Sequence, residues 1–325
     1  MSDSRASEPH VELNEPSTVR VTTGSRLHFG LLDTIAPFGG VGVMVDAPQT
    51  CVVVRPSHGF QCSSKFESRI KPIAERISRW LGWDKLPACR VEVEQAAPSH
   101  FGLGSGTQIS LAVSEGVCHF LRQECDRATL VRELATRGRR SAVGAHGYFL
   151  GGLIYELGDS DADLNPTRKC VKLPKEWTAI VMRPTEEQHM VSGENERDKF
   201  ATLSAADSAS ARLLRQIVSE GIVAGAETQD FPLFADSVRR YNERSGQLFS
   251  QVQGGPYNGP GVTGVIDWLA SEGVVGFGQS SWGPGVFAWC ESKSEAMALK
   301  GRLPPSIELL TATTVRNEPR TLDAS

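Results

Sequence analysis

The segment Pro98-Ser-His-Phe-Gly102-Leu-Gly104-Ser105-Gly106-Thr107-Gln108 carries three glycines at alternate positions. Residues 90–94 before it alternate as in a β-strand, and residues 107–122 after it read as a helix. Glycine lets backbone N–H groups approach a ligand, and the first turn of a helix offers unpaired N–H groups with a partial positive charge. The segment therefore predicts a phosphate-binding loop. The alternative is a tight strand–helix turn in which glycine serves packing alone.

Two better-known phosphate loops do not fit this segment. A Walker loop ends in Gly-Lys-Ser or Gly-Lys-Thr, and that ending is absent. The dinucleotide fingerprint has the spacing G-x-G-x-x-G with an acidic residue about 20 positions later. Here the spacing is G-x-G-x-G and no suitable acid follows. The loop therefore belongs to neither class.

The rest of the chain predicts an α+β protein with two lobes. Strands are expected at 19–23, 50–55, 90–94, 153–157, 177–183 and 306–314, with two more flanking 278–284. Helices are expected at 65–82, 107–122, 126–138, 205–222, 229–250 and 293–301, and glycine-rich segments at 138–152 and 254–264. A polar segment at 158–176 marks the boundary. We therefore expect a disordered tail (1–17), an N-terminal domain with the glycine-rich loop (18–165) and a C-terminal domain (166–325).

Composition narrows the function classes. The chain has 325 residues, 40% hydrophobic and 22% charged, as in ordinary globular proteins. Its formal net charge is −4, whereas a nucleic-acid binder is usually basic, so we do not expect nucleic acid as a partner. No apolar run approaches 18 residues, so we do not expect a membrane as a partner either. The seven cysteines are an odd number without a Cys-x-x-Cys pair, which favours reduced, buried thiols and a cytoplasmic protein.

The glycine-rich segment resembles the phosphate loop of the GHMP kinase superfamily. Together with four other stretches it resembles, more narrowly, the β-ribofuranosylaminobenzene 5′-phosphate synthase family. These stretches are Ser25-Arg-Leu-His-Phe-Gly-Leu-Leu-Asp33, Gly39-Gly-Val-Gly42, Arg140-Ser-Ala-Val-Gly-Ala-His-Gly-Tyr-Phe-Leu-Gly-Gly152 and Gly278-Gln-Ser-Ser-Trp-Gly-Pro-Gly285. The matches run in order through most of the chain.

The resemblance implies a two-lobed GHMP-kinase-like fold, with an S5-domain-2-like N-terminal lobe and a ferredoxin-like C-terminal lobe. It also implies transfer of phosphoribose from phosphoribosyl pyrophosphate to 4-aminobenzoate or 4-hydroxybenzoate, with loss of pyrophosphate and carbon dioxide, in tetrahydromethanopterin biosynthesis. The family further implies Mg²⁺ as cofactor and a homodimer, for neither of which the sequence shows a motif.

Two alternatives stay open. One is an ATP-dependent GHMP-type kinase acting on a small alcohol. Such kinases carry Pro-Ser-Gly-x-Asp, whose Asp activates the hydroxyl, whereas Ser141-Ala-Val-Gly-Ala-His146 contains no Asp. The synthase reaction needs orientation and charge stabilisation on the leaving pyrophosphate rather than this carboxylate, so the missing Asp favours the synthase. The other alternative is a non-catalytic binding protein that uses the loop as a sensor.

Four residues are candidates for the catalytic role. Arg26 and Arg140 suit bidentate capture of phosphate or carboxylate. Arg26 can instead pair with Asp33 in a structural role. His28 and His146 are candidates that can equally be core histidines. For Arg139 we expect a solvated position.

The remaining candidates follow the motifs. The phosphate- and substrate-binding candidates are Ser25, Gly102, Gly104, Ser105, Gly106, Thr107, Gln108, Ser141, Gln279, Ser280 and Ser281. Trp282 offers a flat face to an aromatic substrate, although packing is the commoner role of so large a side chain. Asp33, Glu194 and Glu196 are the candidates for holding magnesium.

Overall fold

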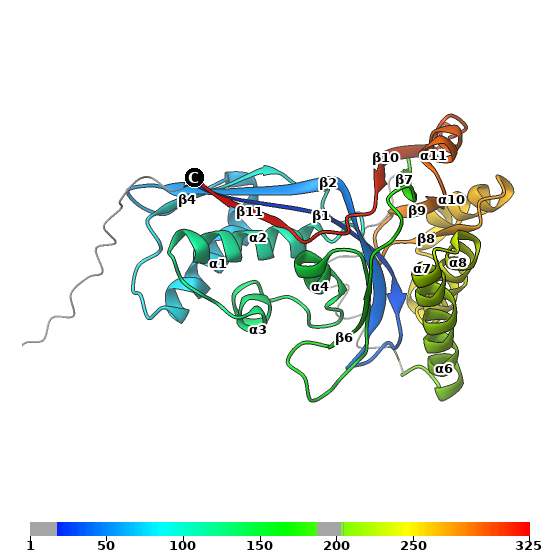
Figure 1. The fold of residues 1–325 in the computed structure, drawn as a ribbon, viewed down its shortest axis with the longest axis horizontal. Helices are drawn as coiled ribbons and strands as arrows, with labels where there is room; N and C mark the ends of the chain where they lie inside the picture. Colours follow the sequence, from blue (N-terminus) through cyan, green and yellow to red (C-terminus); the bar gives the residue numbers. More distant parts are fainter. Residues whose placement is uncertain (1–17, 187–202, 204) are drawn as a thin grey trace, which may run out of the picture.

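A long antiparallel hairpin runs through the molecule in the computed structural model, which describes residues 18–186, 203 and 205–325. Its strands are β1 (Val19–Leu31) and β2 (Gly40–Pro56), drawn in blue in Figure 1. Both strands are rich in β-branched residues and mostly buried, as expected for the centre of a sheet. The first half of β2 pairs with β5 and its second half with β4, so the hairpin connects all parts of the first sheet.

The first lobe is a seven-stranded sheet with helices packed on it. The order is β11-β1-β2-β4-β3, and β5 pairs with β2 and β6. The other strands are β3 (Gln61–Cys62), β4 (Cys89–Gln95), β5 (Leu153–Glu156), β6 (Thr167–Val171) and β11 (Thr321–Ala324). The helices are α1 (Glu67–Trp80), α2 (Ser105–Phe120), α3 (Arg127–Thr129) with a π-helical continuation (Leu130–Leu134), and α4 (Val143–Leu150). Apolar residues of α1 and α2 close the core of this lobe against the valines of β1, β2 and β4.

The second lobe is a four-stranded antiparallel sheet in the order β10-β7-β9-β8. Its strands are β7 (Thr178–Pro184), β8 (Gly276–Gln279), β9 (Val286–Cys290) and β10 (Ile307–Thr314). Its helices are α6 (Ser208–Gln216), continued by a π-helical segment (Ile217–Val223), then α7 (Ala224–Thr228), α8 (Phe231–Gln247), α9 (Ser250–Gln253), α10 (Gly259–Ser271) and α11 (Lys293–Lys300). The strand and helix order is that of a ferredoxin-like lobe, so the expected α+β, two-lobed fold is confirmed.

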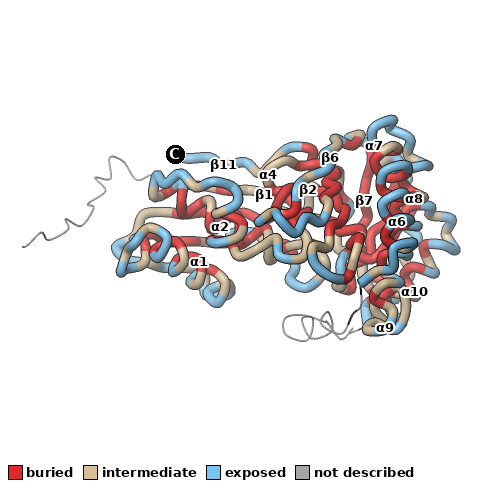
Figure 2. Tube along the Cα trace, turned by 90° about the horizontal axis from the view of Figure 1, so that it is seen from below, coloured by how far each residue is buried: buried red, intermediate tan, exposed pale blue. Residues whose placement is uncertain are grey.

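An aromatic cluster joins the lobes. Phe29 of β1 lies 5.2 Å from Phe287 and 6.3 Å from Trp289 between ring centroids, and Phe234 of α8 packs on the same group. All four side chains are buried. Figure 2 shows this buried region where β1, β2 and β7 meet α7 and α8. Because β1 belongs to the first sheet and α8 to the second lobe, the core fixes one lobe against the other.

The sequence expectations differ from the structure at a few elements. The glycine-rich segment 138–152 contains α4, which was not expected, and α10 begins at Gly259, inside the expected loop 254–264. The helix expected at 126–138 begins after its predicted cap, Asp126, but it ends at Leu134. The boundary at residue 165 does not coincide with the division between sheets, because β6 and β11 both pair in the first sheet. The expected tail 1–17 lies outside the described residues.

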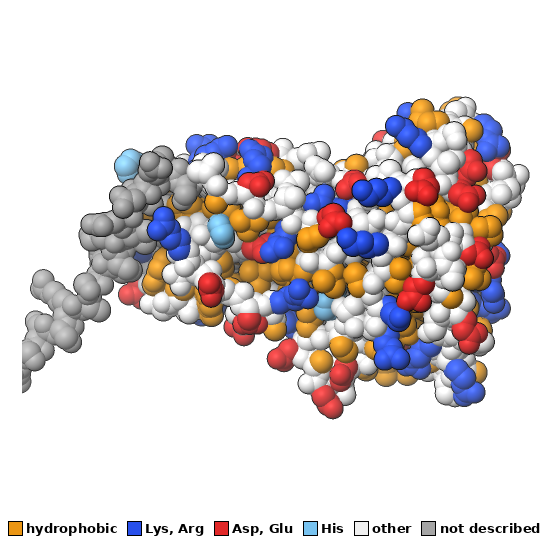
Figure 3. Space-filling model, in the orientation of Figure 1, with side chains coloured by type: hydrophobic (Ala, Val, Ile, Leu, Met, Phe, Trp, Pro, Cys, Tyr) orange, Lys and Arg blue, Asp and Glu red, His pale blue; other side chains and the backbone are white. Residues whose placement is uncertain are grey.

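The surface carries mixed charge. On the face drawn in Figure 3, basic and acidic side chains alternate over both lobes. None of the described helices combines the length and apolar character that crossing a membrane would need. The described cysteines are all free, and Cys170 is exposed, contrary to the expectation that all seven are buried.

Candidate functional site

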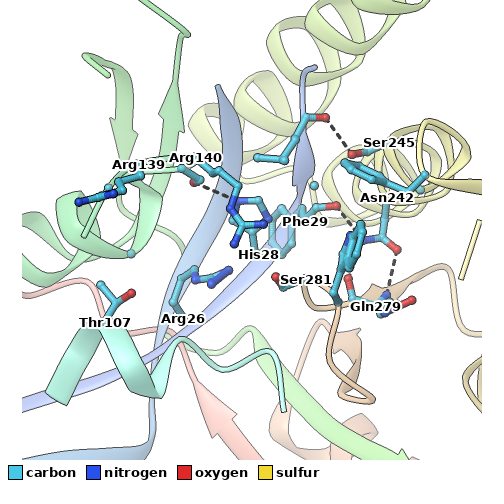
Figure 4. A pocket seen from close by; sticks show the side chains of 18 of the residues that line it. Arg26, His28, Phe29, Thr107, Arg139, Arg140, Asn242, Ser245, Gln279 and Ser281 are labelled. Atoms are coloured by element: carbon cyan, nitrogen blue, oxygen red, sulfur yellow. Dashed lines mark hydrogen bonds between the residues drawn. The ribbon is translucent and has the colours of Figure 1, made fainter. Parts of the chain in front are cut away.

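A cavity of about 940 Å³ opens between the two lobes. It is lined by the end of β1, the first turn of α2, the loop before α4, the end of α8 with the segment after it, and the turn after β8. The lining residues are Arg26, His28, Phe29, Gly30, Leu31, Thr107, Thr136, Arg137, Gly138, Arg139, Arg140, Ser141, Gly144, Asn242, Ser245, Gly246, Phe249, Gln253, Pro256, Gln279, Ser281 and Trp282. In Figure 4, Arg26, Thr107, Arg139 and Arg140 lie on one side, Asn242, Ser245, Gln279 and Ser281 on the other, and His28 between them.

One side of the cavity is strongly basic. Arg26, Arg137, Arg139 and Arg140 line it, and no aspartate or glutamate is among the described lining residues. Burial, together with repulsion from two further arginines at positions 69 and 76, lowers the pKa of Arg137 to about 10. Arginines gathered in this way favour an anion, because phosphate oxygens can accept several of their hydrogen bonds at once. Arg139 is exposed, as the sequence predicts, and it also lines the cavity.

The glycine-rich segment shapes the cavity through two of its glycines. Gly102 has φ +76°, and a Cβ built there would overlap the carbonyl oxygen of Ser280 in the turn after β8. Gly104 has φ +71°, and a Cβ there would come within 3.2 Å of Nε of Arg26. Glycine at these positions allows the loop to meet the second lobe and leaves room for the arginine. Packing thus accounts for both glycines, and a phosphate-binding role of the loop stays a prediction.

The beginning of α2 contributes one side chain to the cavity, that of Thr107. Gln108 is buried, accepts a hydrogen bond of 2.9 Å from Oγ1 of Thr23 and donates one of 2.9 Å to the carbonyl of Gly144. Ser105 and Gly106 lie in the same helical turn without lining the cavity. Their backbone N–H groups, like that of Thr107, belong to the positive end of the helix dipole.

His28 lies at the centre of the site. Its Nε2 is 3.1 Å from Oγ of Ser141, and its backbone N–H donates to Oγ of Ser280 over 3.0 Å. Burial, together with the nearby guanidinium of Arg26, holds the pKa of His28 well below its usual range. The ring is therefore neutral at pH 7 and can donate from one nitrogen only.

The turn after β8 is a link between the lobes. Ser280 is fully buried and donates to the carbonyl of Gly102 over 2.7 Å, so it does not line the cavity. Ser281 has φ +59° and lines it. Gln279 also lines it, although its side chain is held by the backbone N–H of Asn258 and the carbonyl of Gly283.

Some predicted site residues lie elsewhere. Oγ of Ser25 donates to the carbonyl of Pro48 over 2.6 Å, on the opposite face of β1 from Arg26, and Ser25 does not line the cavity. His146 is also outside it, because its Nε2 donates to the carbonyl of Asn165 over 2.7 Å. Burial lowers the pKa of His146, as expected for a structural histidine.

The magnesium candidates do not form a metal site in the described structure. Oδ1 of Asp33 accepts from the backbone N–H groups of Thr34 and Ala206, at 2.7 and 3.0 Å, and Asp33 does not line the cavity. Glu194 and Glu196 lie outside the described residues. Among residues 18–186, 203 and 205–325, no group of three or more His, Cys, Asp or Glu side chains is placed to hold a metal. Magnesium as a cofactor stays a prediction.

Two residues of α8 hold the site together and are not among those predicted from the sequence. Asn242 donates to the carbonyls of Phe29 and Gln279 over 2.7 and 2.8 Å, and Ser245 donates to the carbonyl of Leu31 over 2.8 Å. These bonds hold the end of β1 against the second lobe. The signal in the sequence is a pair of polar residues at i and i+3 on the buried face of an amphipathic helix, where apolar residues are the rule.

An aromatic pair lines the second-lobe side of the cavity. The rings of Phe249 and Trp282 meet edge to face, with centroids 5.4 Å apart and planes at 84°. Both residues line the cavity, and Trp282 directly follows Ser281. The cavity therefore combines a basic side with an aromatic side.

The comparisons with known proteins agree with this architecture. The family model of GHMP kinases N terminal domain matches residues 68–150, and that of GHMP kinases C terminal matches residues 222–305. The chain is 27% identical over 300 residues to a β-ribofuranosylphenol 5′-phosphate synthase of Methanothermobacter thermautotrophicus, covering 84% of this chain and 89% of the relative. A protein of the same name from Archaeoglobus fulgidus is 23% identical, with 85% and 89% covered.

A solved structure extends the likeness to the whole fold. Homoserine kinase from Cytophaga hutchinsonii superposes with a TM-score of 0.63 at 16% identity, covering 97% of this chain and 100% of the kinase. The resemblance found in the sequence motifs is thereby confirmed at the level of the family and the fold. The chain belongs to the GHMP kinase superfamily, within which it is similar to the β-ribofuranosylphenol 5′-phosphate synthases.

Proposed function

We propose that the protein is a decarboxylating phosphoribosyltransferase, which joins phosphoribosyl pyrophosphate to 4-hydroxybenzoate or 4-aminobenzoate. The observation that carries the proposal is a cavity with four arginines on one side and the Phe249–Trp282 pair on the other. A polyphosphorylated sugar and an aryl carboxylate match these two sides. The names of the curated relatives, which are synthases of a ribosylated phenol, support the same pairing.

The phosphate groups of the donor belong on the basic side. Arg26, Arg137, Arg139 and Arg140 offer guanidinium groups, and Thr107 in the first turn of α2 adds its hydroxyl group. As the bond from C1 of the ribose to pyrophosphate breaks, negative charge accumulates on the leaving group. Fixed positive charge in a partly buried site stabilises that charge without reorganisation.

The aromatic acceptor belongs beside Trp282. An offset or edge-to-face contact with the two rings would bury one face of the benzoate, a contribution of about 1 kcal/mol beyond burial of its area. A ring placed there faces the centre of the cavity, where His28 lies, with Arg26 on the side beyond it (Figure 4).

The bond changes balance without an added base or oxidant. The C1–oxygen bond to pyrophosphate breaks, and the ring carbon that bears the carboxylate bonds to C1, helped by electron donation from the para hydroxyl or amino group. The bond to the carboxylate then breaks, carbon dioxide leaves, and the electron pair restores aromaticity. No proton leaves that carbon, so the site needs orientation and charge stabilisation rather than the kinase aspartate.

The experiment is product analysis by mass spectrometry with purified protein, phosphoribosyl pyrophosphate and each benzoate in turn. The proposal expects a ribosylated phenol or aniline 5′-phosphate that has lost the mass of carbon dioxide. A parallel incubation with ATP and small alcohols tests the kinase alternative. An ester or ether product that keeps the carboxylate, or phosphorylation of an alcohol in its place, would overturn the proposal.

A further inference from the structure

A buried carboxyl group lies behind the cavity, at the end of β5. Glu156 is fully buried, and its Oε2 accepts a hydrogen bond of 2.8 Å from the backbone N–H of Ala142, just before α4. Its Oε1 is also buried and has no well-aligned hydrogen-bond partner among the described residues. Burying an ionisable group with incomplete hydrogen bonding is costly. Such a group beside a cavity indicates a functional constraint rather than a contribution to folding.

Ser141 connects this carboxyl group to the site. Its Oγ accepts from the backbone N–H of Val143 over 3.2 Å and lies 3.1 Å from Nε2 of His28. The same hydroxyl is near enough to Glu156 to stabilise its ionised form. A hydroxyl group has one hydrogen, so it can donate to the carboxylate or to the imidazole, but not to both.

The protonation state of Glu156 thereby selects the tautomer of His28. When Glu156 is ionised, Ser141 donates to it, and the neutral imidazole must donate from Nε2 to the serine oxygen. When Glu156 is protonated, the serine hydrogen can turn to Nε2, and the ring proton then resides on Nδ1. Each ring nitrogen of His28 is therefore a hydrogen-bond donor in one state and an acceptor in the other.

The surroundings place this titration near neutral pH. Burial raises the pKa of Glu156 to about 7, against the opposing influence of Ser141, the N–H groups at the start of α4 and the guanidinium of Arg26. From α8, the hydroxyl of Tyr241 faces the group, and burial holds its pKa well above the ordinary value, so it stays neutral. The register partners on β2 and β6 are Gly40 and Thr167, which do not ionise.

We infer that Glu156 is a positioning residue of the site, which sets the hydrogen of Ser141 and the tautomer of His28 and takes up a proton from solvent when a phosphorylated ligand binds. Negative charge brought among the arginines stabilises the neutral form of a nearby carboxyl group. The inference rests on the proposed function only in taking the ligand to be phosphorylated.

The test is calorimetric titration with inorganic pyrophosphate at pH 7, in two buffers of different ionisation enthalpy. We compare the wild type with Glu156→Gln, whose amide oxygen can still accept from Ala142. Because about half of the Glu156 groups are ionised at this pH, the wild type is expected to take up as much as about half a proton more per site than the variant. Protons exchanged by pyrophosphate itself cancel in the difference. Glu124→Gln, at an exposed position, is the matched control and is expected to behave as wild type.

The affinity for pyrophosphate supplies a second readout. With a pKa of about 7 in the free protein, a rise of one pKa unit on binding should give the wild type about a fivefold gain in affinity between pH 8 and pH 6 relative to Glu156→Gln, and a larger rise approaches a limit of about tenfold. A ¹⁵N spectrum of His28 should change its tautomer between these pH values in the wild type, and not in Ser141→Ala, so the inference stays testable even if Glu156→Gln does not fold.

Equal proton uptake and parallel pH profiles in the wild type and Glu156→Gln would overturn the inference while leaving synthase activity untouched. Proton-coupled pyrophosphate binding without synthase turnover would support it and overturn the proposed function instead. Absence of pyrophosphate binding in the wild type would overturn both.

Discussion

Replacing Glu156 by glutamine should make the protein more stable above neutral pH. The carboxyl group has a pKa of 4.5 when exposed, as in the unfolded chain, and about 7 in the folded protein, where burial disfavours its charge. The folded state therefore holds the proton more tightly than the unfolded state. Stability from this group is fully present below pH 4.5 and is lost as the pH rises through 7.

The magnitude follows from the two pKa values. One pKa unit corresponds to about 1.36 kcal/mol, so ionising Glu156 in place costs about 3 kcal/mol at high pH, of which about 2 kcal/mol is lost between pH 5 and pH 7. Glutamine keeps the size and the acceptor for Ala142 but cannot ionise. The difference in free energy of unfolding between variant and wild type should therefore grow by about that amount over this interval.

Urea unfolding followed by fluorescence, at intervals from pH 5 to pH 8, measures this difference. Glu124→Gln serves as the control, because its exposed carboxylate should leave the wild-type pH profile unchanged. A constant difference between Glu156→Gln and wild type over the whole range would refute the reasoning, since a pH-independent effect reflects packing rather than ionisation.

Three further substitutions test the site. Gly102→Ala should lower the free energy of unfolding in urea by about 2 kcal/mol or more, because its Cβ would overlap the facing carbonyl oxygen and its φ is positive. Gly264→Ala in α10 should raise the free energy of unfolding by up to about 1 kcal/mol, because a Cβ there meets nothing within 4 Å. Equal changes in the two variants would contradict the packing argument. Arg140→Ala should raise the KM for phosphoribosyl pyrophosphate about 10- to 100-fold through loss of a charge-assisted hydrogen bond, with the exposed Arg240→Ala as the unaffected control. Trp282→Ala should raise the KM for the benzoate about tenfold and leave that for phosphoribosyl pyrophosphate unchanged, and an equal rise in both would place the ring elsewhere.

The sequence predicts the fold well where periodicity is strong. The helices α1, α2 and α8 and the strands β4 and β7 lie close to their expected positions. α4 was missed because its glycines obscure any helical pattern. In the structure, Gly147 allows α4 to pack against Met44 of β2, so tertiary contact rather than helix propensity explains the helix.

The candidate site was predicted in outline by its motifs. Arg26 and His28 come from one motif and Arg140 and Ser141 from another, and all four meet at one cavity. Ser25 was misplaced because the first strand was expected to end at residue 23. β1 continues to Leu31, and in a strand neighbouring side chains alternate between faces, so Ser25 points away from Arg26.

The contribution of α8 could not be read from the sequence, unlike that of the turn after β8, where Gln279 and Ser281 are predicted site residues that line the cavity. Asn242 and Ser245 act by holding the carbonyl groups of β1, about 210 positions earlier in the chain. Such a contact depends on how two lobes dock, and no local pattern encodes that. The one sequence signal for this contact is the pair of polar residues on the otherwise mainly apolar buried face of α8.

The most direct test of the central claim is release of labelled carbon dioxide from a carboxyl-labelled benzoate. The wild type should release it only when phosphoribosyl pyrophosphate is present, in equal amount to the pyrophosphate formed, and ATP should have no effect. Failure to release carbon dioxide from either benzoate, while ATP is consumed on an added alcohol, would contradict the account and identify the cavity as that of a kinase.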